Sequence, residues 1–324
     1  MKVELRRGGL LESVHQVEAV VIGVDGVIWA TPGAADCATF MRSAAKPFQA
    51  IGLITGGAAD QFGFTAEEVA LASASHYGEE MHTRVVSSML AKIHLTPDAL
   101  RCGIHPPYDK EAAAALTAPP TALHSNCSGK HAAMLAQCVH AGWSLEYLPI
   151  DHPVQQRNLD SVAAFSGLER TRIGIGVDGC GVPSFQLPLS HIATAFLNLI
   201  RPHSQDGPTA QAAERITQAM TDHPRLVGGK GVLGSDLMAA GHGRIVAKGG
   251  AEGLVGIGIR GAALGIALKV VDGSSRALDA AAMTLLDHLE LLSADEAKSL
   301  EPHRRPIVAN VAGQAVGELV ALWP

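Results

Sequence analysis

Residues 18–30 read EAVVIGVDGVIWA, and residues 244–260 read RIVAKGGAEGLVGIGIR. In the first stretch, two β-branched runs flank Asp25-Gly26, a dipeptide typical of a tight hairpin turn. The second stretch predicts strands at 244–247 and 254–260 around a glycine-rich connection. With a further strand predicted at 315–322, strand signals lie toward both ends of the chain. The pattern predicts an α/β protein whose sheet includes both ends.

The part of the chain between these stretches is mainly helical by its apolar spacing. One strand is predicted at 172–177, just before a Gly-rich loop. No internal repeat or low-complexity linker is visible, so we expect residues 1–324 to form a single domain. The expected helices lie near residue 40 and at 65–75, 79–93, 109–116, 130–142, 189–200, 208–222 and 275–292.

The composition excludes several classes of protein. Of the 324 residues, 47% are hydrophobic and 17% charged, and the formal charge is −6, which argues against a disordered chain or a nucleic-acid-binding protein. The first residues lack the apolar core of a secretory signal, and the longest apolar run contains Arg260, so neither export nor membrane insertion is expected. Five cysteines at irregular spacing indicate reduced thiols or metal ligands, so we expect a cytoplasmic protein.

Three separated segments suggest serine chemistry. Ser43-Ala44-Ala45-Lys46 is an S-x-x-K motif, in which a desolvated lysine can take the proton of a serine hydroxyl. Ser75 follows between two predicted helices, and Lys248-Gly249-Gly250 comes at the end of a predicted strand. Serine acyl-transfer enzymes use these elements in this order. The alternative is a capping serine and a surface lysine, since each motif is weak by itself.

Cysteines in two glycine-bearing loops suggest a metal site. Cys127 precedes Lys130 in one loop, and Cys180 lies in the other. Because no C-x2-C pair is present, a closed zinc-finger site is not expected. Two thiolates, a neutral lysine amine and a water could hold zinc, although ordinary buried thiols are the alternative.

Two other patterns are not assigned a function. Residues 256–261 fit G-x-G-x-x-G, but too little chain follows them for a dinucleotide-binding unit, so we expect these glycines to allow close packing. His76 and His82 lack the H-E-x-x-H spacing of metal ligands and are expected to be polar helix residues.

Taken together, these segments resemble the Rhizobium-type L-asparaginase II family. The resemblance rests on residues 11–15, 42–49, 73–76, 126–131, 178–183 and 248–253. It implies hydrolysis of L-asparagine to L-aspartate and ammonia by a homodimer. It also implies a fold similar to serine β-lactamases and glutaminases, with a mixed, largely antiparallel sheet covered by helices.

The resemblance also implies roles for individual residues. Two serine–lysine tandems would be Ser43 with Lys46 and Ser75 with Lys248. A Zn²⁺ ion would be held by Cys127, Lys130, Cys180 and water, shaping the pocket rather than generating the nucleophile. The positions expected near substrate or metal are Arg42, His131 and Asp178.

The resulting hypothesis is a serine amidohydrolase. Ser43 attacks the side-chain amide while Lys46 takes its proton, and Ser75 with Lys248 relays protons or stabilises the oxyanion. Asp178 would attract the substrate ammonium, and Arg42 would orient a carboxylate.

Three alternatives remain open at this point. They are a β-lactamase-like or penicillin-binding esterase using the same S-x-x-K motif, a non-catalytic zinc- or amino-acid-binding protein, and an enzyme whose nucleophile is Cys127 beside His131.

Overall fold

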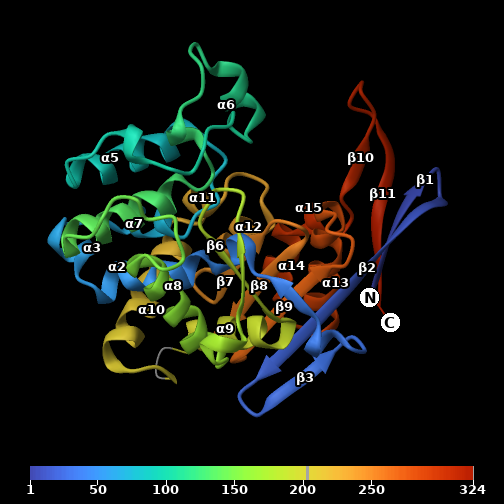
Figure 1. Cartoon of the computed structure of the whole chain (residues 1–324). Coiled ribbons are helices and arrows are strands. Elements are labelled where there is room, and N and C mark those ends of the chain that lie inside the picture. Colours follow the sequence, from blue (N-terminus) through green and yellow to red (C-terminus); the bar gives the residue numbers. More distant parts are fainter. Residues whose placement is uncertain (202–203, 324) are drawn as a thin grey trace.

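Both ends of the chain lie in one antiparallel sheet (Figure 1). The computed structural model describes residues 1–201 and 204–323. The strands follow the order β10-β11-β1-β2-β9-β8-β7, and β3 pairs separately with β2. All pairings in this described sheet are antiparallel. The strands are β1 (Lys2–Arg7), β2 (Leu10–Gly23), β3 (Gly26–Ala30), β7 (Ile245–Gly250), β8 (Leu254–Ile259), β9 (Leu264–Val270), β10 (Ile307–Ala309) and β11 (Ala315–Leu322).

The predicted α/β class and the shared sheet are confirmed. The β2–β3 hairpin turns at Asp25, and β11 pairs with β1 so that Leu322 faces Lys2. The predicted strand at 244–247 is too short, because β7 continues through Lys248 to Gly250. Strands β1, β9 and β10 of this sheet were not predicted, and neither were the short strands at 38–40 and 183–188. β9 is buried over most of its length, so it lacks the alternation of apolar and polar residues that marks a half-exposed strand.

The G-x-G-x-x-G segment serves packing, as expected. Helix α9 (Leu189–Ile200) crosses β8 and β9, and it lies close enough to leave no room for a side chain. A Cβ on Gly256 would lie 1.9 Å from the Phe196 ring, and one on Gly258 would lie 2.5 Å from Ile200. Glycine at these positions therefore sets the distance between helix and sheet.

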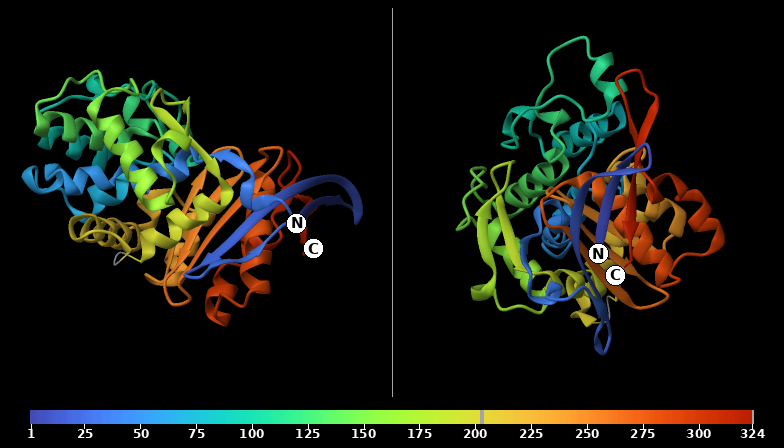
Figure 2. Two further views of the ribbon diagram at one scale, coloured as in Figure 1. Left: turned by 60° about the horizontal axis from the view of Figure 1, so that its bottom comes forward. Right: turned by 90° about the vertical axis from the view of Figure 1, so that its right-hand side faces the viewer.

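Helices cover both faces of the sheet (Figure 2). Helix α9 packs on β2, β8 and β9, and α13 packs on the other face against β1, β9 and β11. Most predicted helices are present, but α8, α12 and the short α3, α11, α14 and α15 were not predicted. The remaining helices are α1 (Lys46–Gln49), α2 (Ile51–Thr55), α3 (Ala58–Gln61), α4 (Ala66–Ala72), α5 (Glu80–Lys92), α6 (Lys110–Ala115), α7 (Ser128–Ala141), α8 (Pro153–Ser166), α10 (Gly207–Asp222), α11 (Pro224–Val227), α12 (Leu233–Gly241), α13 (Leu278–His288), α14 (Ala294–Ser299) and α15 (Glu301–Arg304).

A second, three-stranded sheet carries one of the predicted loops. Its order is β4 (Ala38–Phe40), β6 (Pro183–Pro188) and β5 (Gly174–Val177), and the predicted strand at 172–177 is β5. The segment 178–182 joins β5 to β6, which brings Asp178 and Cys180 near the start of α7. Among the residues that the structure describes, no helix has the length and apolar character needed to cross a bilayer.

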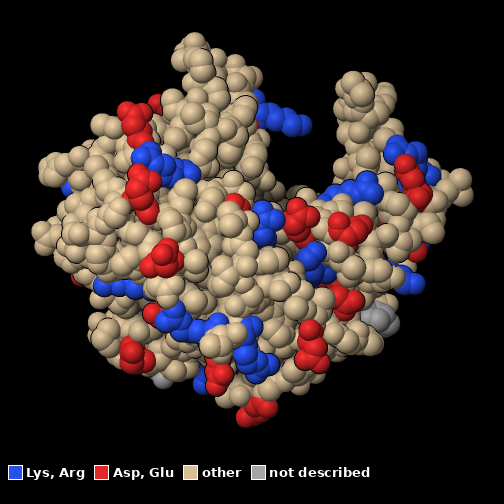
Figure 3. All heavy atoms as spheres, viewed as in Figure 1, with Lys and Arg blue, Asp and Glu red and all other residues tan. Residues whose placement is uncertain are grey.

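Acidic and basic side chains are mixed over the visible surface (Figure 3). That face is hollowed between the segment around α6 and the β10–β11 hairpin.

Candidate active site

Three elements bring the serine and lysine residues together. Ser43 lies in the 3₁₀ helix η2 (Arg42–Ala45), and Lys46 begins α1 directly after it. Ser75 lies in the loop after α4, whose backbone is held by a 2.8 Å hydrogen bond from the Ser75 amide to the Val227 carbonyl. Lys248 comes from strand β7, at the edge of the main sheet. The site therefore depends on the contact between the helical body and this edge strand.

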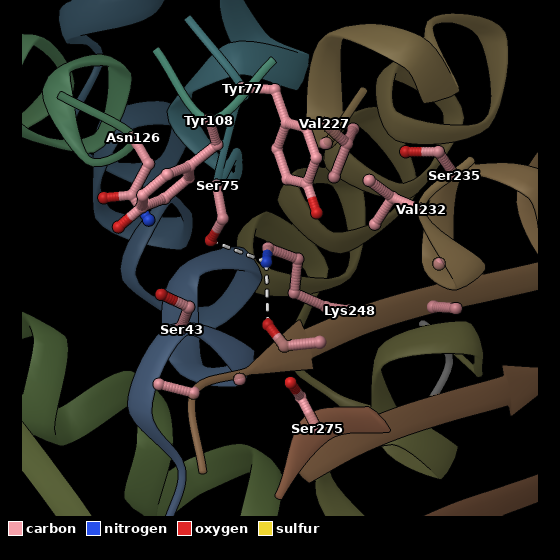
Figure 4. A pocket seen from close by; sticks show the side chains of 16 residues that line it. Ser43, Ser75, Tyr77, Tyr108, Asn126, Val227, Val232, Ser235, Lys248 and Ser275 are labelled. Carbon is pink, nitrogen blue, oxygen red and sulfur yellow. Dashed lines mark hydrogen bonds between the residues drawn. The ribbon is translucent and has the colours of Figure 1, made fainter. Parts of the chain in front are cut away.

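Both lysines contact the same serine. The Nζ atoms of Lys46 and Lys248 lie 2.9 Å and 2.8 Å from Ser75 Oγ (Figure 4 shows the second contact). Lys46 also donates to the carbonyls of Ala74, at 2.6 Å, and Asn126, at 3.3 Å. The second bond of Lys248 is 2.8 Å to the Gly249 carbonyl. Ser75 Oγ is thus held between two amines.

The surroundings of Lys46 favour a positively charged ammonium group, whereas those of Lys248 favour a neutral amine. Burial lowers the pKa of Lys46. Burial also holds the pKa of Lys248 well below its usual value, and the charge of Lys46 adds to that effect. The three acceptors around Lys46 match the three protons of an ammonium group. Lys248 has two contacts, which match a neutral amine that donates to Gly249 and accepts the Ser75 proton. The arrangement indicates a charged Lys46 and a neutral, basic Lys248.

Ser43 lies at the same cavity but is not held by either amine. Within residues 1–201 and 204–323, no hydrogen bond joins Ser43 to Lys46, so the pairing expected from the S-x-x-K motif is not formed here. The expected contact between Ser75 and Lys248 is present. Lys46 is the first residue of α1, and Pro47 lies in the first turn of that helix. The side chain of Lys46 extends past Ser43 to the loop that carries Ser75.

These side chains face a cavity of about 350 Å³. In Figure 4, Ser75 lies between the two tyrosines at the top of the view, with Ser43 and Lys248 below them. Lys248 is the one Lys, Arg, Asp or Glu among its lining residues. Burial raises the pKa of both tyrosines, so they remain hydroxyl donors at neutral pH. The lining residues are Ser43, Ser75, Tyr77, Tyr108, Asn126, Val227, Gly228, Val232, Gly234, Ser235, Ala247, Lys248, Gly249, Gly250, Ala251 and Ser275.

A cluster of two thiols and an amine lies behind the serines. Cys127 precedes the first turn of α7, Lys130 lies in that turn, and Lys130 Nζ is 3.1 Å from Cys180 Sγ. A hydrogen bond from Cys180, with the nearby amines of Lys46 and Lys130, holds the pKa of the Cys127 thiol well below its usual value. Donating that bond raises the pKa of Cys180. Burial opposes the charge of Lys130, but the two sulfurs and Asp178 raise its pKa.

The donor chemistry of this cluster fits zinc. Thiolate sulfur and an unprotonated amine nitrogen are donors that Zn²⁺ accepts, and all three side chains are buried. Counting only His, Cys, Asp and Glu, no group of three or more in the described part of the chain could hold a metal ion. A site here would therefore require Lys130 as a ligand.

Arg42 and Asp178 form an ion pair outside the cavity lining. Arg42 Nε lies 2.7 Å from Asp178 Oδ1, and their side chains are 27% and 9% exposed. Arg42 adopts a φ of 48°, a left-handed conformation that costs a non-glycine residue roughly 1 kcal/mol. Burial opposes the charge on Asp178, but Lys130 and Arg42 keep its pKa below the usual value. The pair ties η2 to the Cys180 loop.

The histidines occupy buried positions. His131 Nδ1 lies 2.8 Å from the Tyr147 hydroxyl, and Nε2 has no partner in the described structure. Burial lowers the pKa of His131, and Lys130 lowers it further, so the ring is neutral. The prediction that His76 and His82 are polar helix residues holds for His82, which lies in α5, and is wrong for His76. His76 lies in the Ser75 loop, both rings are buried and stacked, and His76 Nε2 contacts Ser128 Oγ at 2.8 Å, because these rings fill the space under that loop.

Sequence reasoning missed several polar residues of the cavity. Tyr77 is two positions after Ser75, so its place in that loop could have indicated it. Tyr108 and Ser275 belong to no motif, and only the fold brings them to the cavity. Their hydroxyls give the cavity hydrogen-bonding groups beyond the serine–lysine set.

Comparisons with known proteins were made for the whole chain. A family model described as L-asparaginase II matches residues 3–321, which include all the site residues above. Among solved structures, a candidate β-lactamase from Bacteroides dorei DSM 17855 is 12% identical, with a TM-score of 0.45. That similarity covers 78% of this chain and 84% of the other, and it carries no argument about activity. No curated protein matches the sequence significantly.

Proposed function

We propose, from the premise that the chain belongs to the L-asparaginase II family, that it hydrolyses L-asparagine through a serine acyl-enzyme. Membership of this family indicates an amidohydrolase that acts on a small molecule. The finer proposal is carried by one observation, the placement of Ser75 Oγ between Lys46 and Lys248 at a cavity that also exposes Ser43.

Ser43 is the proposed nucleophile. Its hydroxyl lines the cavity without a hydrogen-bond partner in the described structure, whereas the Ser75 hydroxyl is held by both amines. Ser43 Oγ bonds to the amide carbon as its proton moves through Ser75 to the neutral amine of Lys248. The charge of Lys46 stabilises the negative charge that builds up on Ser75 during this transfer. Catalytic contacts often close only when substrate binds, so the open gap at Ser43 is compatible with this role.

The second half of the reaction reverses the proton path. The C–N bond breaks as the leaving nitrogen takes the proton held by Lys248, and ammonia departs. Water then attacks the ester of Ser43 and gives its proton to the same amine. The ester bond breaks, Ser43 recovers its proton, and L-aspartate is released.

Zinc is part of the same proposal. Cys127, Lys130 and Cys180 would hold it, after Lys130 loses a proton. Bound there, Zn²⁺ would supply a positive charge and a rigid link between α7 and the loop that carries Asp178 and Cys180. The residues that line the cavity perform the steps above. The metal-binding residues Cys127, Lys130 and Cys180 hold the start of α7 and the Cys180 loop in position behind those residues.

Ammonia release from L-asparagine tests the proposal. We expect activity in the wild type and its loss in Ser43→Ala, with unchanged circular dichroism. Ser75→Ala is expected to retain slow acylation if Ser43 is the nucleophile, so a trapped adduct on Ser43 identified by mass spectrometry separates the two serines. Full activity in Ser43→Ala, or an adduct on Ser75, would contradict the assignment. Turnover of nitrocefin without ammonia release would favour the esterase instead.

A homodimer is also proposed, on the family resemblance. Light scattering during size-exclusion chromatography tests it directly. A mass near twice 33.6 kDa is expected, and a mass near 33.6 kDa at all concentrations would contradict it.

A further inference from the structure

The cavity at Ser43 continues into a second one. The second cavity has a volume of about 600 Å³ and shares with the first Tyr77, Val232, Gly234, Gly249, Gly250 and Ser275. Its far side is formed by the start of α13 and the base of the β10–β11 hairpin. The first cavity has Lys248 as its one Lys, Arg, Asp or Glu, whereas the second is lined by Arg276 and Asp279. Ser43 lines the first cavity and the two charges line the second, and Ser275 belongs to the wall that both cavities share.

Arg276 is held in place without being neutralised. Its Nε donates to His15 Nε2 at 2.9 Å, and Nη2 donates to Ser13 Oγ at 3.2 Å. His15 Nδ1 lies 2.6 Å from Asp272 Oδ2, so that nitrogen donates to the carboxylate while Nε2 accepts from Arg276. No carboxylate of the described residues forms an ion pair with Arg276. Its guanidinium keeps Nη1 available to a ligand.

Asp279 is held in a similar way from the other side. His303 Nδ1 contacts Asp279 Oδ2 at 2.8 Å, and His303 Nε2 contacts Asp236 Oδ2 at 2.8 Å. Oδ1 of Asp279 has no hydrogen-bond partner in the part of the chain that is described. Two carboxylates around one imidazolium leave a net negative charge at this group. Asp279 also raises the pKa of Tyr77, in addition to the effect of burial, which agrees with its place beside the shared wall.

Arg276 lies in the 3₁₀ turn η7 (Ser275–Ala277), and Asp279, three positions later, lies in the first turn of α13. Such a pair commonly forms a salt bridge, but in the described structure no salt bridge joins these two. Each charge is instead bound to a separate support, one on β2 and one on α15. Arg276 and Asp279 line the same cavity, and a cation and an anion there suit a ligand that carries a carboxylate and an ammonium on one carbon.

We propose that Arg276 binds the α-carboxylate, and Asp279 the α-ammonium, of a free amino-acid amide whose side chain reaches Ser43. The assignment rests on the proposed function and adds the residues that select the substrate. It differs from the expectation for Arg42 and Asp178, which neutralise each other and do not line either cavity. A peptide-bound asparagine lacks both free charges and is excluded by this arrangement.

Two truncated substrates separate the charges. β-Alaninamide is asparagine without its carboxylate, and succinamate is asparagine without its ammonium. We measure kcat/KM for ammonia release from L-asparagine and from both amides. In Arg276→Gln, the ratio of L-asparagine to β-alaninamide should fall about 10- to 100-fold, the range for a lost charge-assisted hydrogen bond. In Asp279→Asn, the ratio of L-asparagine to succinamate should fall by a similar factor. The amide oxygen introduced by Asp279→Asn can still accept the bond from His303, so the fold is retained.

Controls distinguish local from general effects. Arg305→Gln removes an exposed arginine that does not line either cavity, and it should leave both ratios unchanged. Arg276→Lys should recover part of the loss. Calorimetric binding of L-aspartate gives a readout that does not need turnover, and its Kd should rise at least tenfold in both variants.

Each outcome bears on one proposal. If the wild type releases ammonia but both ratios stay constant, the charge assignment is overturned and the proposed function stands. A shift of the ratios in Asp178→Asn instead of Asp279→Asn also overturns it. If no amide is hydrolysed, the proposed function fails, and the L-aspartate titration still decides whether Arg276 and Asp279 bind the two charges.

Discussion

Replacing Lys248 by methionine tests both the chemistry and the electrostatics of the site. Methionine keeps an unbranched side chain of similar length and removes the amine that lies 2.8 Å from Ser75 Oγ. Loss of a general base costs roughly 10²- to 10⁴-fold in rate, or about 3–5 kcal/mol in activation free energy. Lys46 cannot replace it, because its three protons already have three acceptors. We therefore expect kcat for asparagine hydrolysis to fall by at least 100-fold.

The same substitution should change how stability depends on pH. Burial lowers the pKa of Lys248, so the unfolded chain binds one more proton than the folded chain between the lowered pKa and the ordinary value near 10.4. Wild-type stability must rise with pH in that window through this group. Lys248→Met removes this contribution, so its melting temperature should exceed that of the wild type at pH 7 and converge with it toward pH 10.

Thermal denaturation at pH 7, 8, 9 and 10, beside the ammonia assay, checks both parts. Lys298→Met is the matched control, because Lys298 is exposed near the C-terminal end of α14. It should change neither activity nor the pH dependence. A Lys248→Met enzyme within tenfold of wild-type kcat would refute the assignment of the base. An unchanged pH slope would refute the neutral amine.

Three other predictions concern particular contacts. A Cβ on Gly256 would lie 1.9 Å from the Phe196 ring, so Gly256→Ala should lower the free energy of unfolding by about 1–3 kcal/mol in urea titration. Gly261→Ala is the control, because the atom nearest to a Cβ there is 4.0 Å away. A smaller loss of stability in Gly256→Ala than in Gly261→Ala would contradict the prediction. Asp236 and Asp279 raise the pKa of His303 to about 9 against the effect of burial, so the stability it supplies is complete below pH 6.5 and is lost as the pH rises through 9. His303→Gln should thus lower the free energy of unfolding by ~1–2 kcal/mol at pH 6 and much less at pH 10. Equal losses of unfolding free energy at both pH values would contradict this prediction. Purified wild type should contain zinc by elemental analysis and Cys180→Ser should contain little, whereas equal zinc in both would place the metal elsewhere.

Much of the fold was accessible from local patterns. The β-branched runs on both sides of Asp25-Gly26 and the glycine at 142 that ends a helix are signals that a few residues determine by themselves, and the structure agrees with both. Strand β9 escaped prediction because it is buried between neighbours on both edges, so its pattern depends on distant residues. His76 was misjudged for the same reason, since nothing nearby in the sequence shows that its loop is covered.

The sequence by itself determined which groups the site could use. The S-x-x-K motif, the cysteine loops and Lys248-Gly249-Gly250 are short and chemically distinctive, so they stand out in the sequence alone. Only the tertiary structure decided how those groups pair. Lys46 reaches Ser75 instead of Ser43 because the path of its side chain depends on the contact of α1 with a loop 29 residues away. Arg276 and Asp279 became candidates only when β2 and α15 were seen to hold them apart, since long-range contacts set the positions of charges and leave no local pattern.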